Sequence, residues 1–170
     1  TVEGQLPIVG RNAPFVGITE QALNPGVAFG TLTFIPTSEL ATAVLGPRVV
    51  LVTDSVPNDI GFVGGLVTEA LQTPLAHVNV LSQNRGTPNL AVLDARNRSE
   101  FEPFFGELVR LEVSESGFTV RLADLAEAQA HWASIMPPGP AQTPARDLTV
   151  RGIQDLLDRD FTDIPSIGGK

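Results

Sequence analysis

The chain of 170 residues contains no cysteine, which excludes disulfide bonds, a thiol nucleophile and cysteine-ligated metal ions. Basic residues are also scarce, because 11 lysines and arginines stand against 19 acidic residues, giving a net charge of −8. Such a balance disfavours nucleic-acid binding, which relies on cationic side chains to neutralise phosphates. No apolar run approaches the ~20 residues of a membrane span. We therefore expect neither a nucleic-acid nor a membrane partner.

The N-terminus has no basic stretch leading into an apolar one, so we see no signal peptide and expect a cytoplasmic protein. The first residue is Thr1 rather than Met, so we expect that the natural start has been removed. Hydrophobic residues make up 42% of the chain, enough for one real core.

Glycine, proline and short β-branched runs divide the chain into three parts. Residues 1–19 have no clear period and predict an irregular N-terminal arm. Residues 20–122 predict a compact mixed α/β domain, in which strands and helix alternate before a final hairpin. Residues 123–170 predict a helical and proline-rich connector, with helices over 123–134 and 148–160.

Within the central domain, apolar runs and turn residues predict strands at 26–35, 48–53, 62–68 and 89–93, and a hairpin of 106–113 with 118–122. A short helix is expected at 37–40, with Thr37 or Ser38 as its N-cap.

A helix containing His77 is expected between the last two central strands. Thr73 followed by Pro74 predicts its start, with Thr73 as N-cap, and Gly86 is a suitable residue just beyond its end. Side chains on a helix lean toward its N-terminus, where unpaired N–H groups favour an anion. A histidine placed there can carry a phosphoryl group whose charge is stabilised.

The segment around His77 resembles the phosphohistidine swivel domain of the dikinases that make or use phosphoenolpyruvate, such as pyruvate phosphate dikinase and phosphoenolpyruvate synthase. The family motif places Gly-x-Pro at a fixed distance after the histidine, and Gly86 and Pro88 match it here. An upstream segment is similar to the family's opening Ser-Pro-Gly-x-Ala-x-Gly: Asn24-Pro25-Gly26-Val27-Ala28-Phe29-Gly30. Three other segments are similar to the remaining strands of that domain: Val49–Thr53, Gly65–Glu69 and Arg110–Arg121.

The resemblance implies a compact swivelling β/β/α domain in which His77 accepts a phosphoryl group from ATP. The nucleotide and Mg²⁺ would be bound by an ATP-grasp partner domain, and no cofactor or metal by this domain. An acceptor-binding domain, usually for pyruvate, would receive the phosphoryl group. Both partners are expected in the same longer chain, because Gly168-Gly169-Lys170 is similar to the opening of the ATP-grasp domain.

Neutral imidazole is a usable nucleophile at physiological pH. Besides the helix N–H groups, we expect Thr73, Thr68 and Arg85 to contact the phosphate. Two of these residues also have a structural interpretation. Thr73 is equally explained as a plain helix cap, and Arg85 as a cation that complements the end of the helix.

Two other groups of residues have simpler structural explanations. We expect Asn79 and His131 to be structural. The acidic residues Asp155, Asp158, Asp160 and Asp163 fit no calcium loop and predict a solvated helix face.

The sequence also departs from the family at the motif itself. Ala76 stands where the family has Ser or Cys, Ala70-Leu71-Gln72 replaces a glycine pair, and Gln83 occupies a usual arginine position. These departures leave two alternatives open. One is a catalytically silent swivel-fold module for binding or assembly, and the other is a phosphotransferase whose acceptor is not pyruvate, such as a glucan, an antibiotic or water.

Overall fold

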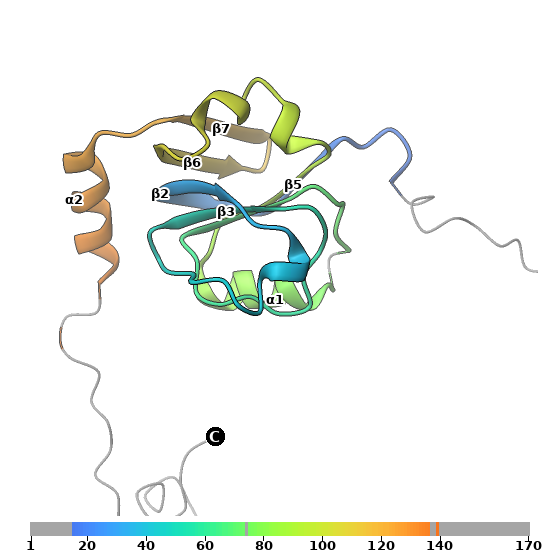
Figure 1. Ribbon diagram of the computed structural model, residues 1–170, viewed down its shortest axis with the longest axis horizontal. Helices are drawn as coiled ribbons and strands as arrows, with labels where there is room; N and C mark the ends of the chain where they lie inside the picture. Colours follow the sequence, from blue (N-terminus) through green and yellow to red (C-terminus); the bar gives the residue numbers. More distant parts are fainter. Residues whose placement is uncertain (1–14, 74, 137–138, 140–170) are drawn as a thin grey trace, which may run out of the picture. The chain divides into compact units, whose positions relative to one another are not determined.

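A computed structural model describes residues 15–73, 75–136 and 139 of the chain. The chain divides into two compact units, Thr1–Ser134 and Ile135–Lys170, and nearly all of the second lies outside the described residues. The helix predicted over 148–160 and the acidic residues Asp155 to Asp163 fall there as well. The first unit is a mixed α/β fold in which one curled sheet carries two α-helices (Figure 1).

The sheet has seven strands in the order β1-β5-β4-β3-β2-β6-β7. Strands β2 to β5 are parallel neighbours, while β1, β6 and β7 run antiparallel to the strands they pair with. β1 also lies close to β6 and β7, so the sheet curls and its two edges approach each other. The strands are β1 (Glu20–Asn24), β2 (Gly26–Phe34), β3 (Val49–Thr53), β4 (Gly65–Thr68), β5 (Asn89–Val92), β6 (Leu108–Ser114) and β7 (Gly117–Leu122).

The predicted strands at β2, β3, β5 and the β6–β7 hairpin are confirmed, one predicted strand is shorter than expected, and β1 was not predicted. The strand expected from residue 62 begins only at Gly65. Gly64 instead donates its N–H to Val49 O at 2.9 Å, and a Cβ on it would lie 2.6 Å from Pro47 O. The arm predicted as irregular up to residue 19 leads into β1, which no alternating pattern in its sequence reveals.

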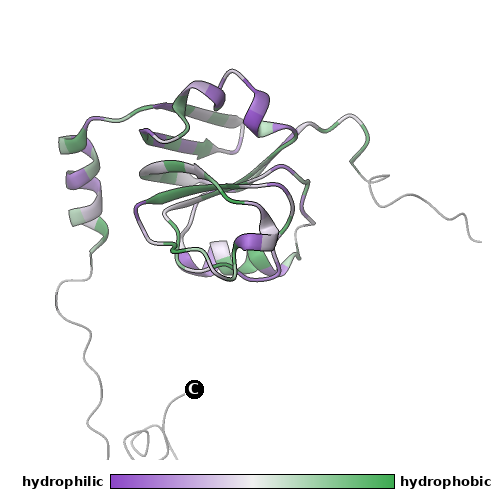
Figure 2. Ribbon diagram, in the orientation of Figure 1, coloured by the Kyte–Doolittle hydropathy of each residue, from purple (hydrophilic) through white to green (hydrophobic). Residues whose placement is uncertain are grey.

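The two faces of the central strands bury different side chains, as expected where successive residues point to opposite sides. The first, which we call the hairpin face, is an aliphatic core under β6 and the segment that holds Phe101. The second, the helix face, is covered by α1 (His77–Arg85) and the loops after β2 and β3. Figure 2 colours most of β3 as hydrophobic, in agreement with its position between the hairpin face and the helix face.

The short helix expected at 37–40 is confirmed as a 3-10 turn, η2 (Thr37–Glu39), but neither Thr37 nor Ser38 caps it. The residue at its N-cap is Pro36, which makes no side-chain cap bond. Thr37 instead donates both its N–H, at 2.9 Å, and its hydroxyl, at 2.6 Å, to the Asp54 carboxylate at the end of β3.

Helix α2 (Leu125–Ile135) is confirmed near its predicted position. It was expected as part of a connector, and in the structure it also contacts the sheet. Trp132 donates its indole N–H to Phe29 O at 3.0 Å, and the Arg48 guanidinium lies 4.6 Å from the Trp132 ring. His131 packs against Phe29 with ring centroids 4.9 Å apart, in agreement with the structural role expected for it. In the part of the chain described, no helix is both long and apolar enough to cross a membrane.

Candidate functional site

The helix that carries His77 begins later than the sequence predicts. α1 starts at His77 itself, with Ala76 as its N-cap, and no side chain caps it. Thr73 is therefore not the N-cap; its carbonyl instead accepts a hydrogen bond from Ala76 N–H at 2.9 Å, which closes a turn before the helix. The predicted end is confirmed, because Gly86 takes the left-handed conformation with φ of 63° just after Arg85.

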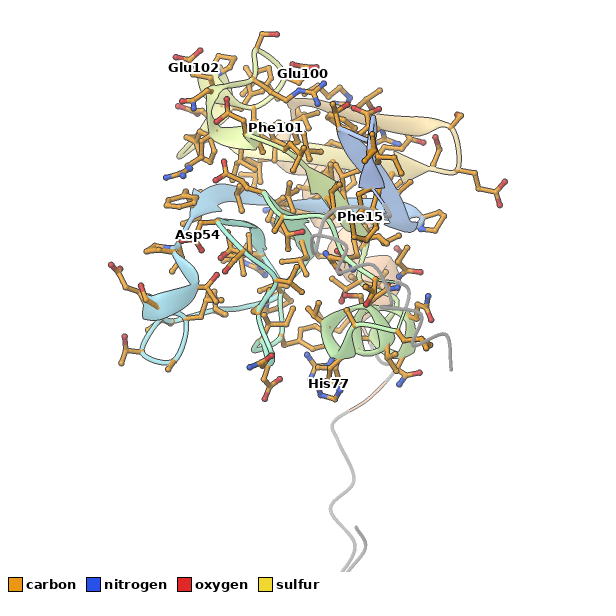
Figure 3. All side chains as sticks on the ribbon, turned by 90° about the vertical axis from the view of Figure 1, so that its right-hand side faces the viewer. Phe15, Asp54, His77, Glu100, Phe101 and Glu102 are labelled. Atoms are coloured by element: carbon orange, nitrogen blue, oxygen red, sulfur yellow. The ribbon has the colours of Figure 1, made fainter. Side chains whose placement is uncertain are left out.

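This shift places His77 at the first helical position. The side chain is exposed, and its ring points away from the sheet at the start of α1 (Figure 3). The first backbone hydrogen bonds of the helix run from Asn79 and Val80 to Ala76 O. The N–H groups of His77 and Val78 precede these bonds, in the position where helix starts attract anions.

The chain segment that contains His77 carries less negative charge than the rest of the sequence. Residues 70–88 include no aspartate or glutamate, although the whole chain has 19 of them. Arg85 is the only lysine or arginine in this segment. An anionic group approaching the start of α1 therefore meets no acidic side chain from this segment, which favours its binding.

The three other predicted phosphate contacts lie in different places. Thr73 is exposed and lies four residues before His77, in the turn that precedes the helix. Arg85 lies at the opposite end of α1, about 12 Å away at 1.5 Å per residue, and donates to Ile60 O at 3.1 Å. The structure thus brings Thr73, but not Arg85, near the histidine.

Thr68 is fully buried at the end of β4. Its hydroxyl donates to Ala70 O at 2.8 Å and accepts from Gln72 Nε2 at 2.9 Å. A phosphate contact by Thr68 would require these hydrogen bonds to be exchanged. The predicted phosphate contact of Thr68 would therefore compete with the hydrogen bonds that its hydroxyl makes to Ala70 and Gln72.

A group of buried side-chain amides lies beneath the start of α1, and its role was not predicted from the sequence. Gln72 and Asn89 form a reciprocal pair: Gln72 Nε2 donates to Asn89 Oδ1 at 3.0 Å, and Asn89 Nδ2 donates back to Gln72 Oε1 at 3.2 Å. Asn89 Nδ2 also donates to Asn79 Oδ1 in α1 at 3.4 Å. All three residues are at most 2% exposed. The sequence signal that could have indicated this group is Asn89, a polar residue that is unusual at the start of the apolar strand β5.

A cavity of about 740 Å³ opens beyond the carboxyl ends of β3, β4 and β5, the edge where open α/β sheets bind ligands. It reaches Ala76 but is not lined by His77. The exposed imidazole therefore faces solvent rather than this cavity. Its lining is mainly apolar: Phe15, Ile18, Ser55, Val56, Glu69, Ala70, Leu71, Gln72, Thr73, Ala76 and Leu93.

No group of acidic and histidine side chains suited to a metal ion occurs among the residues described. The chemical resources of His77 are its imidazole ring, the helix start and a chain segment, residues 70–88, without acidic residues. Searches against protein-family models and curated proteins return no match for the chain. The resemblance to dikinase swivel domains consequently rests on the motifs themselves.

Proposed function

We propose that this chain is a phosphohistidine carrier, a swivel domain that moves a phosphoryl group between two partner sites. The observation that carries the proposal is the exposed imidazole of His77 at the first position of α1. The motifs that surround this histidine in the sequence add support, since a lone surface histidine would be an ordinary feature. The proposal places ATP and Mg²⁺ on an ATP-grasp partner and the acceptor, such as pyruvate, on another domain.

In the proposed first step, the lone pair of an unprotonated ring nitrogen of His77 attacks phosphorus. The P–N bond forms while the P–O bond to the nucleotide breaks, and the leaving oxygen takes the bonding pair. In the second step an acceptor oxygen attacks the same phosphorus, and the P–N bonding pair returns to the ring. The N–H groups of His77 and Val78 would stabilise the phosphoryl oxygens in both steps.

The exposure of the ring supports transfer in both directions. A carrier must present the same atom to a donor site and then to an acceptor site, so the ring cannot be enclosed in its own domain. The low negative charge of residues 70–88 also favours contact with a polyphosphate.

The proposal is tested by labelling the protein, expressed from its whole reading frame, with ³²P-ATP in an extract of its own cells. We expect an acid-labile, base-stable phosphate on His77, located by mass spectrometry under alkaline conditions. His77→Asn should abolish the label. His131→Asn is the matched control, because it removes the second of the chain's two histidines, and it should retain the label.

The silent binding module remains the second candidate because Thr68 and Arg85 donate their hydrogen bonds within the domain. That alternative predicts no phosphate on His77 together with stable association of an ATP-grasp domain. A label that persists in His77→Asn would contradict the carrier proposal directly.

A further inference from the structure

The buried amides beneath α1 form a network in which the donor and acceptor of each hydrogen bond are fixed. The Thr68 hydroxyl donates to Ala70 O, so it must accept from Gln72 Nε2. Gln72 in turn exchanges two hydrogen bonds with Asn89, whose remaining amide proton goes to Asn79. Outside the network, Gln21 Oε1 accepts the backbone N–H of Gln72 at 2.8 Å.

This network holds the chain on both sides of His77. Gln72 lies five residues before the histidine, in the loop that follows β4, and Asn79 lies two residues after it, in the first turn of α1. Asn89, at the start of β5, connects the two. The loop and the helix start are therefore tied to the same point of the sheet.

Burying side-chain amides costs free energy unless each polar group finds a partner. A satisfied network of this kind consequently favours one arrangement over all those in which its members separate. Aliphatic contacts alone would tolerate a small slide or rotation of α1, because they have no direction. The directional bonds of the amides instead define how the start of α1 is rotated over β4 and β5.

We propose that Gln72 is a positioning residue for His77: through Asn89 and Asn79 it fixes the rotation of α1 and hence the direction of the imidazole. The consequence for phosphoryl transfer rests on the proposed function, since in-line attack needs the ring nitrogen and phosphorus aligned. Gln72 belongs to the segment Ala70-Leu71-Gln72, which replaces a glycine pair of the resembled family. We call the hydrogen-bonded residues Gln72, Asn89 and Asn79 the clamp. In this chain part of the clamp thus occupies the place of the family's glycine pair.

Two variants and one control test the clamp. Gln72→Met keeps approximate volume but removes the amide, so Asn89 loses both hydrogen bonds that it exchanges with Gln72. The double variant Gln72→Met with Asn89→Leu removes both amides of the pair, so it should regain stability relative to the single variant. Val109→Ala is the control, because it lowers stability from the hairpin face, where Val109 is fully buried.

In the ³²P-ATP assay we expect Gln72→Met to lower the rate of His77 labelling about tenfold or more. The double variant should remain slow although its unfolding free energy recovers, and Val109→Ala should label close to the wild-type rate. Recovery of the rate together with stability in the double variant would overturn the clamp. A comparable slowing in Val109→Ala would overturn it as well.

A partner-independent measurement separates failure of the clamp from failure of the proposed function. If the wild-type chain takes up no label, the carrier proposal fails, and the clamp is judged by NMR of the ¹⁵N-labelled chain. The clamp predicts that the double variant shifts the His77 ring signals and the amide signals of Val78 and Asn79, while Val109→Ala does not. Unchanged signals in the double variant would reject the clamp whatever the labelling result.

Discussion

The two faces of the same parallel strands differ in what they bury. On the hairpin face, β3, β4 and β5 contribute Val50, Val52, Val67, Leu90 and Val92, all aliphatic. On the helix face the buried alternate residues of the same strands are Leu51, Thr53, Leu66, Thr68, Asn89 and Ala91, half of them polar. All of these side chains are buried, so exposure to water does not explain the difference.

The hairpin face is therefore held by apolar burial, whereas the helix face combines an apolar cluster with directional hydrogen bonds. Aliphatic contacts on the hairpin face contribute free energy in proportion to the area they bury, with little preference for one orientation. The hydroxyls and amides of the helix face contribute less net free energy but fix geometry, because their hydrogen bonds require a defined direction between donor and acceptor. His77, the candidate nucleophile, belongs to the layer with the directional contacts.

The largest effect should come from the hairpin face. Phe101 is fully buried and stacks on Phe118 with ring centroids 5.3 Å apart. Phe101→Ala removes most of a buried ring and leaves a cavity, which should cost about 3–5 kcal/mol of unfolding free energy. Urea denaturation followed by far-UV circular dichroism measures this loss.

Under conditions where Phe101→Ala remains folded, the NMR signals of the His77 ring should stay at their wild-type positions. Movement of these signals would show that the two faces do not have the separate roles assigned to them.

The sequence predicted the hairpin face better than the helix face. Apolar runs such as residues 49–53 and 89–92 identify strands, but both buried faces of a parallel strand look alike in such a run. The end of α1 was predicted correctly, because Gly86 adopts a conformation that other residues avoid.

The start of α1 was predicted wrongly because its determinants are distant in sequence. Gln72 pairs with Asn89, 17 residues away, and its backbone is held by Gln21, 51 residues away. A helix-capping pattern at Thr73 and Pro74 depends only on neighbouring residues, so it contains no information about these distant contacts. The exposure of His77 follows from the same arrangement and likewise has no local signature.

An intermediate effect should come from the buried hydroxyl at the end of β4. Thr68→Val preserves shape but removes the acceptor for Gln72 Nε2 and the donor to Ala70 O. A loss of about 1–3 kcal/mol is expected, since buried polar groups then lack partners. Amide hydrogen exchange should quicken at residues 70–79 before it does on the hairpin face.

Thr53→Val provides the matched control, because Thr53 occupies the equivalent position at the end of β3 and is also fully buried. Its hydroxyl lies 3.0 Å from Thr37 Oγ1, outside the amide network. Exchange in α1 should therefore stay near the wild-type rate. Equal quickening in both variants would remove the special role given to the amides.

The smallest effect should come from Asp54, which ties η2 to the end of β3 in the helix-face layer. Hydrogen bonds from the Thr37 side chain and backbone hold the pKa of Asp54 below its ordinary value of 3.8. A lowered pKa stabilises the folded state above the ordinary value, and this contribution disappears as the pH falls through the lowered pKa. Asp54→Asn should thus be less stable than wild type at neutral pH.

Because Asp54 is exposed to solvent, the difference should stay below about 1 kcal/mol. Thermal unfolding of both proteins between neutral pH and the lowered pKa should show their midpoints converging as the pH falls. Asp59→Asn, further along the same loop between β3 and β4, controls for the loss of one exposed negative charge and should not reproduce the convergence. A difference between wild type and Asp54→Asn that is independent of pH would mean that the carboxylate acts through shape alone. The contacts between Asp54 and Thr37 would then stabilise the fold through packing and not through the charge of the carboxylate.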